Sequence, residues 1–179
     1  MDDRDILMLF KEGQEHYAFN LLVDKYSERL YWHIRKMVLS HEDADDLLQD
    51  VLVKVWNSLS GFREESKLFT WLYRIATNEA LTFIKRAKLR AFLSLTDHAE
   101  KLDRRLAADP YFNGDNIQRI FYKAISKLPQ KQRAVFTMRY FEEMSYEDIS
   151  EILGGSVGAL KASYHHAYHK IQKFLREAD

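Results

Sequence analysis

The sequence predicts an all-α protein with two small helical domains joined by a flexible linker, the C-terminal domain being a helix-turn-helix. Only two prolines and six glycines occur in 179 residues, and apolar residues recur at helical rather than alternating spacing. This length suffices for one medium domain or two small ones. Because the periodicity weakens around the segment AADPYFNGD, we expect domains at residues 1–90 and 116–179, with a linker at residues 91–115.

Three helices are expected in the first domain. The first begins near Glu15, and the second follows Ser40, a suitable N-cap with Asp43 three residues on. Gly61 ends the second helix, the stretch SGFREESK forms an exposed loop, and the third helix runs from about residue 68 to 89. Each helix has one apolar side to bury. On the first helix that side consists of Ala18, Phe19, Leu22, Tyr26, Leu30, Ile34, Met37 and Val38.

The second domain is predicted to end in a helix-turn-helix. An amphipathic segment over residues 117–128 stops at Pro129, which suits the first turn of the next helix, QKQRAVFTMRYF. Ser145 can cap the helix after that, and Gly154-Gly155 makes a tight turn into a long basic helix. Two helices joined in this way are typical of DNA-binding domains.

Composition indicates a protein of the cytoplasm. The chain has no cysteine, which excludes disulfides, zinc ribbons and thiolate chemistry. Its first residues, MDDRDILMLF, are acidic where a signal peptide is basic, and no apolar run approaches the roughly 20 residues that span a bilayer. We therefore expect a soluble, cytoplasmic protein that does not insert into membranes.

Charge is balanced overall but uneven along the chain. There are 27 basic and 27 acidic residues, a balance that does not by itself favour a nucleic acid as partner. Residues 1–60 carry 7 basic and 12 acidic side chains, a net of −5. Residues 116–139 carry six basic side chains and residues 154–176 carry four, both without an acid. The distribution of charge along the chain is therefore more informative than the net charge.

The third helix carries a stripe of polar and aromatic side chains. At about 100° per residue, Arg74, Asn78, Thr82 and Lys85 lie within about 60° of Trp71. The stripe suits a nucleic acid, since cations hold phosphates, amides read base edges and aromatic rings stack on unpaired bases. The alternative is that Trp71 packs under the preceding loop and the rest is solvated. The basic stretch KRAKLR at the end of the stripe favours DNA.

The last helix places three histidines on its outer face. His165, His166 and His169 lie opposite the buried side centred on Leu160, together with lysines. His165 and His169 are four residues apart, a spacing at which two imidazoles can bind one metal ion. Because the helix offers no third ligand and lacks the Glu of H-E-x-x-H, we expect neither a metal site nor a cofactor. A solvated face without a role is the other alternative.

Two long segments resemble conserved regions of one protein family. The segment DADDLLQDVLVKVWNSLSGFREESKLFTWLYRIATNEALTFIKR resembles region 2 of bacterial RNA polymerase sigma factors of the extracytoplasmic-function (ECF) group. The segment LPQKQRAVFTMRYFEEMSYEDISEILGGSVGALKASYHHAYHKI resembles region 4 of the same group. They occur in the family's order and cover most of the chain outside the linker. The resemblance implies that core RNA polymerase and promoter DNA are partners.

The resemblance implies two roles for the first domain. The helix after Ser40 would dock on the clamp helices of the polymerase's largest subunit, where an acidic face suits a basic partner. Its contact residues would be Asp45, Asp46, Gln49, Asp50 and Val53. The loop and the third helix would hold a flipped base of the −10 element and flank the separated strand. Their contact residues would be Phe62, Arg63, Ser66, Trp71, Arg74, Asn78 and Lys85.

In the second domain, the resemblance implies that the last helix enters the major groove at the −35 element. Its contact residues would be Lys161, Ala162, Ser163, His165, His166 and His169. Relatives usually carry arginines where this chain has Ser163, His166 and Tyr168. A neutral imidazole adds little phosphate attraction, although it can donate and accept at a base edge. We therefore expect a weak −35 contact that relies on polymerase for affinity.

Other functions would explain fewer features of the sequence than the sigma-factor resemblance does. No Ser/His/Asp set, glycine-rich phosphate loop or pair of carboxylates stands out, so we do not expect an enzyme. A stand-alone repressor or activator would explain residues 116–179 but would leave the Trp71 stripe and the acidic helix without a role. The ECF group is commonly held inactive by an anti-sigma protein, often membrane-anchored, and the resemblance implies such a partner.

Overall fold

The computed structural model describes residues 1–94, 98–112 and 114–178. In chain order the elements are α1 (Asp3–Lys11), α2 (Glu15–Val38), α3 (His41–Ser58), the 3-10 turn η1 (Leu59–Gly61), α4 (Leu68–Ser94), α5 (His98–Ala108), α6 (Asn116–Ser126), α7 (Gln130–Tyr140), α8 (Tyr146–Leu153) and α9 (Val157–Glu177). Those ranges contain no strand, and none of their helices is long and apolar enough to cross a membrane. The expected all-α class is confirmed. We call α1–α4 the N-terminal domain and α6–α9 the C-terminal domain.

Local sequence explains where several helices begin. Ser40, Ser145 and Ser156 precede α3, α8 and α9 in extended backbone. Each serine hydroxyl accepts the backbone N–H three residues on, at 3.3, 3.1 and 3.1 Å respectively. Gly154 and Gly155 make the turn into α9 with φ of 76° and 86°, a region that glycine adopts without strain. The expected caps and glycine turn are confirmed.

One helix forms before the first helix that the sequence predicts. α1 begins after Asp2, whose side chain and that of Asp5 form a reciprocal capping box. The helix buries Ile6 and Leu7, and it packs against α2. The N-terminal segment is therefore part of the N-terminal domain.

The segment predicted as a flexible linker is largely folded. α4 continues to Ser94, and α5 packs on α6 and buries Leu106. Phe112, beyond α5, is also fully buried. The weak periodicity thus reflects a short helix that buries few side chains rather than the absence of a helix. Residues 95–97 and Asn113 of the predicted linker lie outside the described residues.

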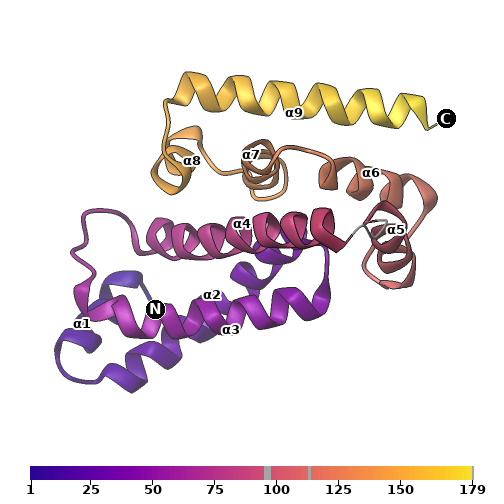
Figure 1. The fold of residues 1–179 in the computed structure, drawn as a ribbon. Coiled ribbons are helices and arrows are strands. Elements are labelled where there is room, and N and C mark those ends of the chain that lie inside the picture. The colour runs from indigo at the N-terminus through magenta and orange to yellow at the C-terminus, as the bar shows by residue number, and fades with distance from the viewer. Residues whose placement is uncertain (95–97, 113, 179) are drawn as a thin grey trace.

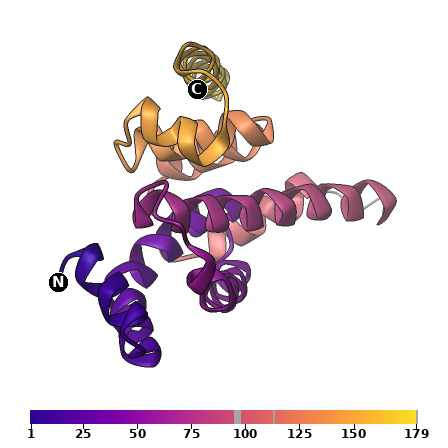
Figure 2. The same cartoon turned by 90° about the vertical axis from the view of Figure 1, so that its left-hand side faces the viewer.

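The C-terminal domain packs on the side of α4 that faces away from α2 and α3. One side of α4 contacts α2 and α3, and the other contacts α7 and α8. α9 lies across α6, α7 and α8 as the outermost layer, while α1–α3 lie beyond α4 (Figure 1). The same order of layers is visible from the side in Figure 2. The domains therefore meet on α4, with a further contact between α2 and α7.

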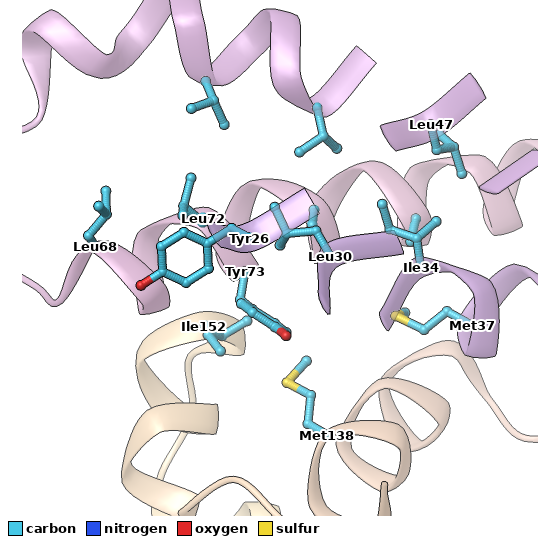
Figure 3. Close-up of a cluster of buried hydrophobic side chains, with 14 of the residues drawn as sticks. Tyr26, Leu30, Ile34, Met37, Leu47, Leu68, Leu72, Tyr73, Met138 and Ile152 are labelled. Carbon is cyan, nitrogen blue, oxygen red and sulfur yellow. The ribbon is translucent and has the colours of Figure 1, made fainter. Parts of the chain in front are cut away.

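One hydrophobic cluster continues across this boundary. Met138 of α7 and Ile152 of α8 belong to the same buried cluster as Leu72 and Tyr73 of α4, and they point toward Tyr73 (Figure 3). A second cluster joins the C-terminal domain to the segment around Phe112. The docking of the domains thus buries apolar side chains from both.

Candidate nucleic-acid and polymerase interfaces

The outer face of α3 is acidic and exposed. The five residues predicted to bind polymerase are all solvent-exposed: Asp45, Asp46, Gln49, Asp50 and Val53. The opposite face buries Ala44, Leu47, Val51 and Val55 against the rest of the N-terminal domain. The Val53 side chain, which shares this face with the carboxylates, is 59% exposed. An apolar side chain surrounded by acids is an arrangement that a partner protein can cover and pair with.

The loop before α4 brings one aromatic pair together. The Phe62 and Trp71 ring centroids are 5.0 Å apart, and both side chains are half-buried. This is the packing that the alternative interpretation of Trp71 predicted. Arg63 is exposed and Ser66 is half-buried in the same loop. At the surface, Glu64 of the loop pairs with Lys11 of α1.

The stripe along α4 is only partly available to a nucleic acid. Asn78 and Lys85 are exposed. Arg74 is half-buried, and its Nε and Nη2 donate to the Glu151 carbonyl oxygen of α8 at 3.0 and 2.6 Å. Asn78 lies about 10 Å further along the helix axis than Trp71, because each residue adds about 1.5 Å. The structure therefore keeps the stripe on one side of α4 but engages Arg74 with the other domain.

On α9 the predicted exposed and buried faces agree with the burial seen in the structure. Lys161, Ala162, His165, His166 and His169 are exposed and Ser163 is half-buried, whereas Leu160, Ala167 and Ile171 are buried. Half-buried Tyr164 stacks on the Phe136 ring of α7 at 5.7 Å, which holds α9 on the domain. Its outer face is left to solvent. The exposed histidines therefore lie on the solvent-facing side of the last helix.

The histidines of α9 lie close together without forming a metal site. The rings of His165 and His169 are 4.2 Å apart between centroids, and those of His165 and His166 are 6.2 Å apart. Nowhere in the described ranges do three or more His, Cys, Asp or Glu side chains group so that they could hold a metal ion. The chemistry that this face offers is hydrogen bonding from imidazole, hydroxyl and ammonium groups.

A buried histidine joins the two domains. His33 of α2 is 1% exposed, and its Nδ1 lies 2.6 Å from Oε1 of Glu142, which follows α7. Its Nε2 lies 2.8 Å from the Thr77 hydroxyl of α4, and its ring packs on Tyr73 at 4.9 Å. Because an ionised carboxylate only accepts hydrogen bonds, Nδ1 is the donor to Glu142. Burial, and then the Glu142 carboxylate, raise the pKa of Tyr73.

A buried arginine makes a second link between the domains. Arg133 of α7 is 5% exposed, and its Nη1 donates to the Met37 carbonyl oxygen of α2 at 3.0 Å. Nη2 donates to the Ser126 carbonyl oxygen. Burial lowers the pKa of Arg133 to about 10. These links were not predicted from the sequence, because residues such as His33 and Arg133 look like ordinary polar neighbours of an apolar seam.

Comparison with known proteins agrees with the two-domain organisation. Residues 22–90 match the family described as Sigma-70 region 2, and residues 118–171 match Sigma-70, region 4. The ECF RNA polymerase sigma-E factor of Haemophilus influenzae is 30% identical over 184 residues, which cover 98% of this chain and 96% of that protein. The ECF RNA polymerase sigma factor SigW of Bacillus subtilis is 28% identical over 175 residues, covering 93% of each.

Two solved structures have a similar fold. One is the sigma factor RpoE in complex with the anti-sigma factor NepR from Bartonella quintana, with a TM-score of 0.67 and 26% identity over 88% of this chain and 96% of that chain. The other is CnrH in complex with the cytosolic domain of CnrY, with a TM-score of 0.70 and 23% identity over 99% of both chains. The second likeness shows the fold alone.

Proposed function

Because this chain belongs to the ECF group of sigma-70 RNA polymerase sigma factors, we propose that it recognises −35 and −10 promoter elements for core RNA polymerase and promotes promoter melting. Sigma factors are initiation factors rather than catalytic enzymes, so the polymerase performs the chemistry. The site of action is then the cytoplasm, where bacterial promoters lie.

The exposed face of α3 is the observation that carries the proposal. A stand-alone repressor needs a DNA-binding domain but has no use for an acidic face with a protruding valine on a separate domain. Asp45, Asp46, Gln49, Asp50 and Val53 form such a face. Carboxylates around an apolar side chain favour a basic, partly apolar protein surface as partner. Core polymerase, bound through its clamp helices, is the partner that the family resemblance supplies.

Promoter melting is assigned to the loop before α4 and to α4 itself. Phe62 and Trp71 provide an aromatic surface on which an unpaired base can stack. Arg63, Ser66 and Asn78 supply hydrogen-bonding groups for a base held outside the duplex. Arg74 and Lys85 supply charge for the strand. Arg74 can contact DNA only after it leaves the Glu151 carbonyl oxygen of α8.

Recognition of the −35 element is assigned to the outer face of α9. The face offers one ammonium group and three imidazoles, with small side chains that allow a close approach to base edges. Its contact residues are Lys161, Ala162, Ser163, His165, His166 and His169. Few permanent charges lie on this face, so its binding to duplex DNA depends on polymerase being anchored nearby.

Reconstituted transcription tests the function. Core RNA polymerase and the purified chain are combined with genomic DNA fragments, and start sites are mapped. We expect transcripts to begin at a small set of promoters with common −35 and −10 sequences. A chain that binds a duplex operator tightly but gives core polymerase no promoter selectivity would be a stand-alone repressor or activator, and the sigma proposal would be wrong.

An inhibitory partner is a further part of this proposal. The similar RpoE structure was solved as a complex with the anti-sigma factor NepR. We infer that this chain too is held inactive by an anti-sigma protein, which is membrane-anchored in many members of the group. Co-expression of the protein encoded beside this chain, followed by transcription with core polymerase, tests for such an inhibitor.

A further inference from the structure

The docking of the C-terminal domain covers part of the surface assigned to the −10 element. α8 packs on α4, and Ile152 is buried beside Tyr73 of α4 (Figure 3). Two arginine nitrogens of Arg74 are bound to the Glu151 carbonyl oxygen. A single strand cannot occupy the position of α8 or bind the same guanidinium nitrogens. The docked arrangement and a fully engaged −10 strand are therefore mutually exclusive.

A buried hydrogen bond between His33 and Glu142 fixes where the C-terminal domain docks. Glu142 lies between α7 and α8, and its carboxylate meets the buried imidazole of His33 at 2.6 Å. The other charged or titratable groups at this position are Tyr73 and Arg29, which interact with each other, and Tyr73 also interacts with Glu142. A carboxylate left there without its partner would be buried and uncompensated, which is strongly unfavourable. The pair therefore favours one docked position over others.

A buried ion pair fastens the linker to the N-terminal domain. Asp109 pairs with Arg35 of α2, and both side chains are largely buried. The Arg35 guanidinium also lies over the ring of Phe112 at 4.8 Å, and Tyr111 packs on Trp32 with centroids 4.5 Å apart. These contacts shorten the free connection between the domains. While they are intact, they keep the C-terminal domain close to α4.

We propose that the docked arrangement is an autoinhibited state and that the buried pairs His33–Glu142 and Arg35–Asp109 set its population. The inference rests on the proposed function, since the covered surface is inhibitory only if it binds the −10 strand. In the docked state the strand-binding stripe is blocked at Arg74. Binding of polymerase and promoter DNA shifts the population to an open state in which both buried pairs are broken.

Single-molecule energy transfer measures the two states directly. The chain has no cysteine, so Glu65→Cys and Ala159→Cys place dyes only at the loop before α4 and at the start of α9. Lys67 of this loop lies 3.2 Å from Asp148 of α8, so the loop is close to α8 in the docked state. We expect one high-transfer population in the otherwise unchanged chain. Glu142→Gln and Asp109→Asn should each raise the ratio of low-transfer to high-transfer molecules at least tenfold.

Two matched variants control for the loss of a carboxylate. Glu143→Gln changes an exposed neighbour of Glu142, and Asp24→Asn changes an exposed residue of α2. Both should leave the transfer distribution unchanged. Circular dichroism checks that the helices persist. If Glu142→Gln loses helix content, Asp109→Asn decides the question, because Asp109 lies outside both helical domains. Unchanged distributions in folded variants would overturn the proposal.

A binding measurement tests whether the docked state inhibits. A single-stranded oligonucleotide from a mapped −10 region is titrated into each chain without polymerase. Its apparent affinity should rise in proportion to the open fraction, about tenfold for a tenfold shift from a mostly closed population. Opening without any gain in strand affinity would show that docking is not inhibitory. The energy-transfer measurement needs neither DNA nor polymerase. It therefore tests the effect of the two buried pairs on domain docking independently of the proposed sigma function.

Discussion

The two helices assigned to DNA, α4 and α9, differ in how their outward faces are used within the molecule. On α9, His165, His166 and His169 are exposed. On α4, Trp71 packs on Phe62, and Arg74 is bound to α8. A free face can bind its target at once, whereas a covered face must first lose its neighbour. We therefore expect contact with the −35 element to precede full contact with the −10 element.

Trp71→Ala should have the largest effect and tests the covered face. Stacking of a base on an aromatic side chain contributes about 1–3 kcal/mol, so open-complex formation should fall about tenfold or more. Closed-complex binding should change by no more than about twofold. Permanganate reactivity of −10 thymines reports melting, and Trp71→Phe, which keeps an aromatic ring, is the control. Equal melting by the alanine variant would remove Trp71 from the strand-binding surface.

His166→Arg should have the next largest effect and tests the exposed face. A permanent charge beside the phosphates should raise affinity for duplex −35 DNA about fivefold at low salt, and the salt dependence should steepen by about one ion. Fluorescence anisotropy at several salt concentrations measures both, with His166→Ala for comparison. An arginine that changed neither quantity would indicate that this face does not approach the backbone.

Ser156→Ala should weaken the start of α9. Its hydroxyl accepts the backbone N–H of Ala159, and loss of an N-cap costs about 1 kcal/mol of unfolding free energy. Urea unfolding followed by circular dichroism measures the change. Ser60→Ala, at an exposed serine in η1, serves as the control. Equal loss in both variants would argue against a capping contribution.

Lys67→Met should have the smallest effect and sharpens the contrast between exposed and buried pairs. Lys67 and Asp148 are 3.2 Å apart, but the lysine side chain is largely exposed. Such pairs contribute about 0–1 kcal/mol, so the ratio of open to docked molecules should change by no more than about twofold. The energy-transfer assay applies here too. A shift as large as that of Glu142→Gln would show that the surface pair, rather than the buried pairs, stabilises the docked state.

Features determined by nearby residues could be predicted from the sequence. The caps at Ser40, Ser145 and Ser156 and the turn at Gly154 and Gly155 depend on residues at most three positions away, and all are present. The outward placement of the α9 histidines also followed, because helical periodicity alone separates a buried face from an exposed one. Short-range geometry is what a single sequence encodes most directly.

Features determined by distant residues could not be predicted. The pair His33–Glu142 joins positions 109 residues apart, and Arg35–Asp109 joins positions 74 apart. No spacing rule relates such residues. Nothing in the sequence pattern indicates α5, because a short helix that buries few side chains has weak periodicity. α1 carried usable signals, since Asp2 can cap a helix and Ile6 and Leu7 lie one turn further on.

The hydrophobic cluster shared by the two domains also bears on how long the protein survives in a cell. When the domains separate, Met138, Ile149 and Ile152 and the facing side of α4 come into contact with water. Exposed apolar surface of this kind promotes aggregation and recognition by chaperones and proteases. Open molecules that do not reach polymerase should be the first to be degraded, which ties the abundance of the factor to the amount of polymerase free to receive it.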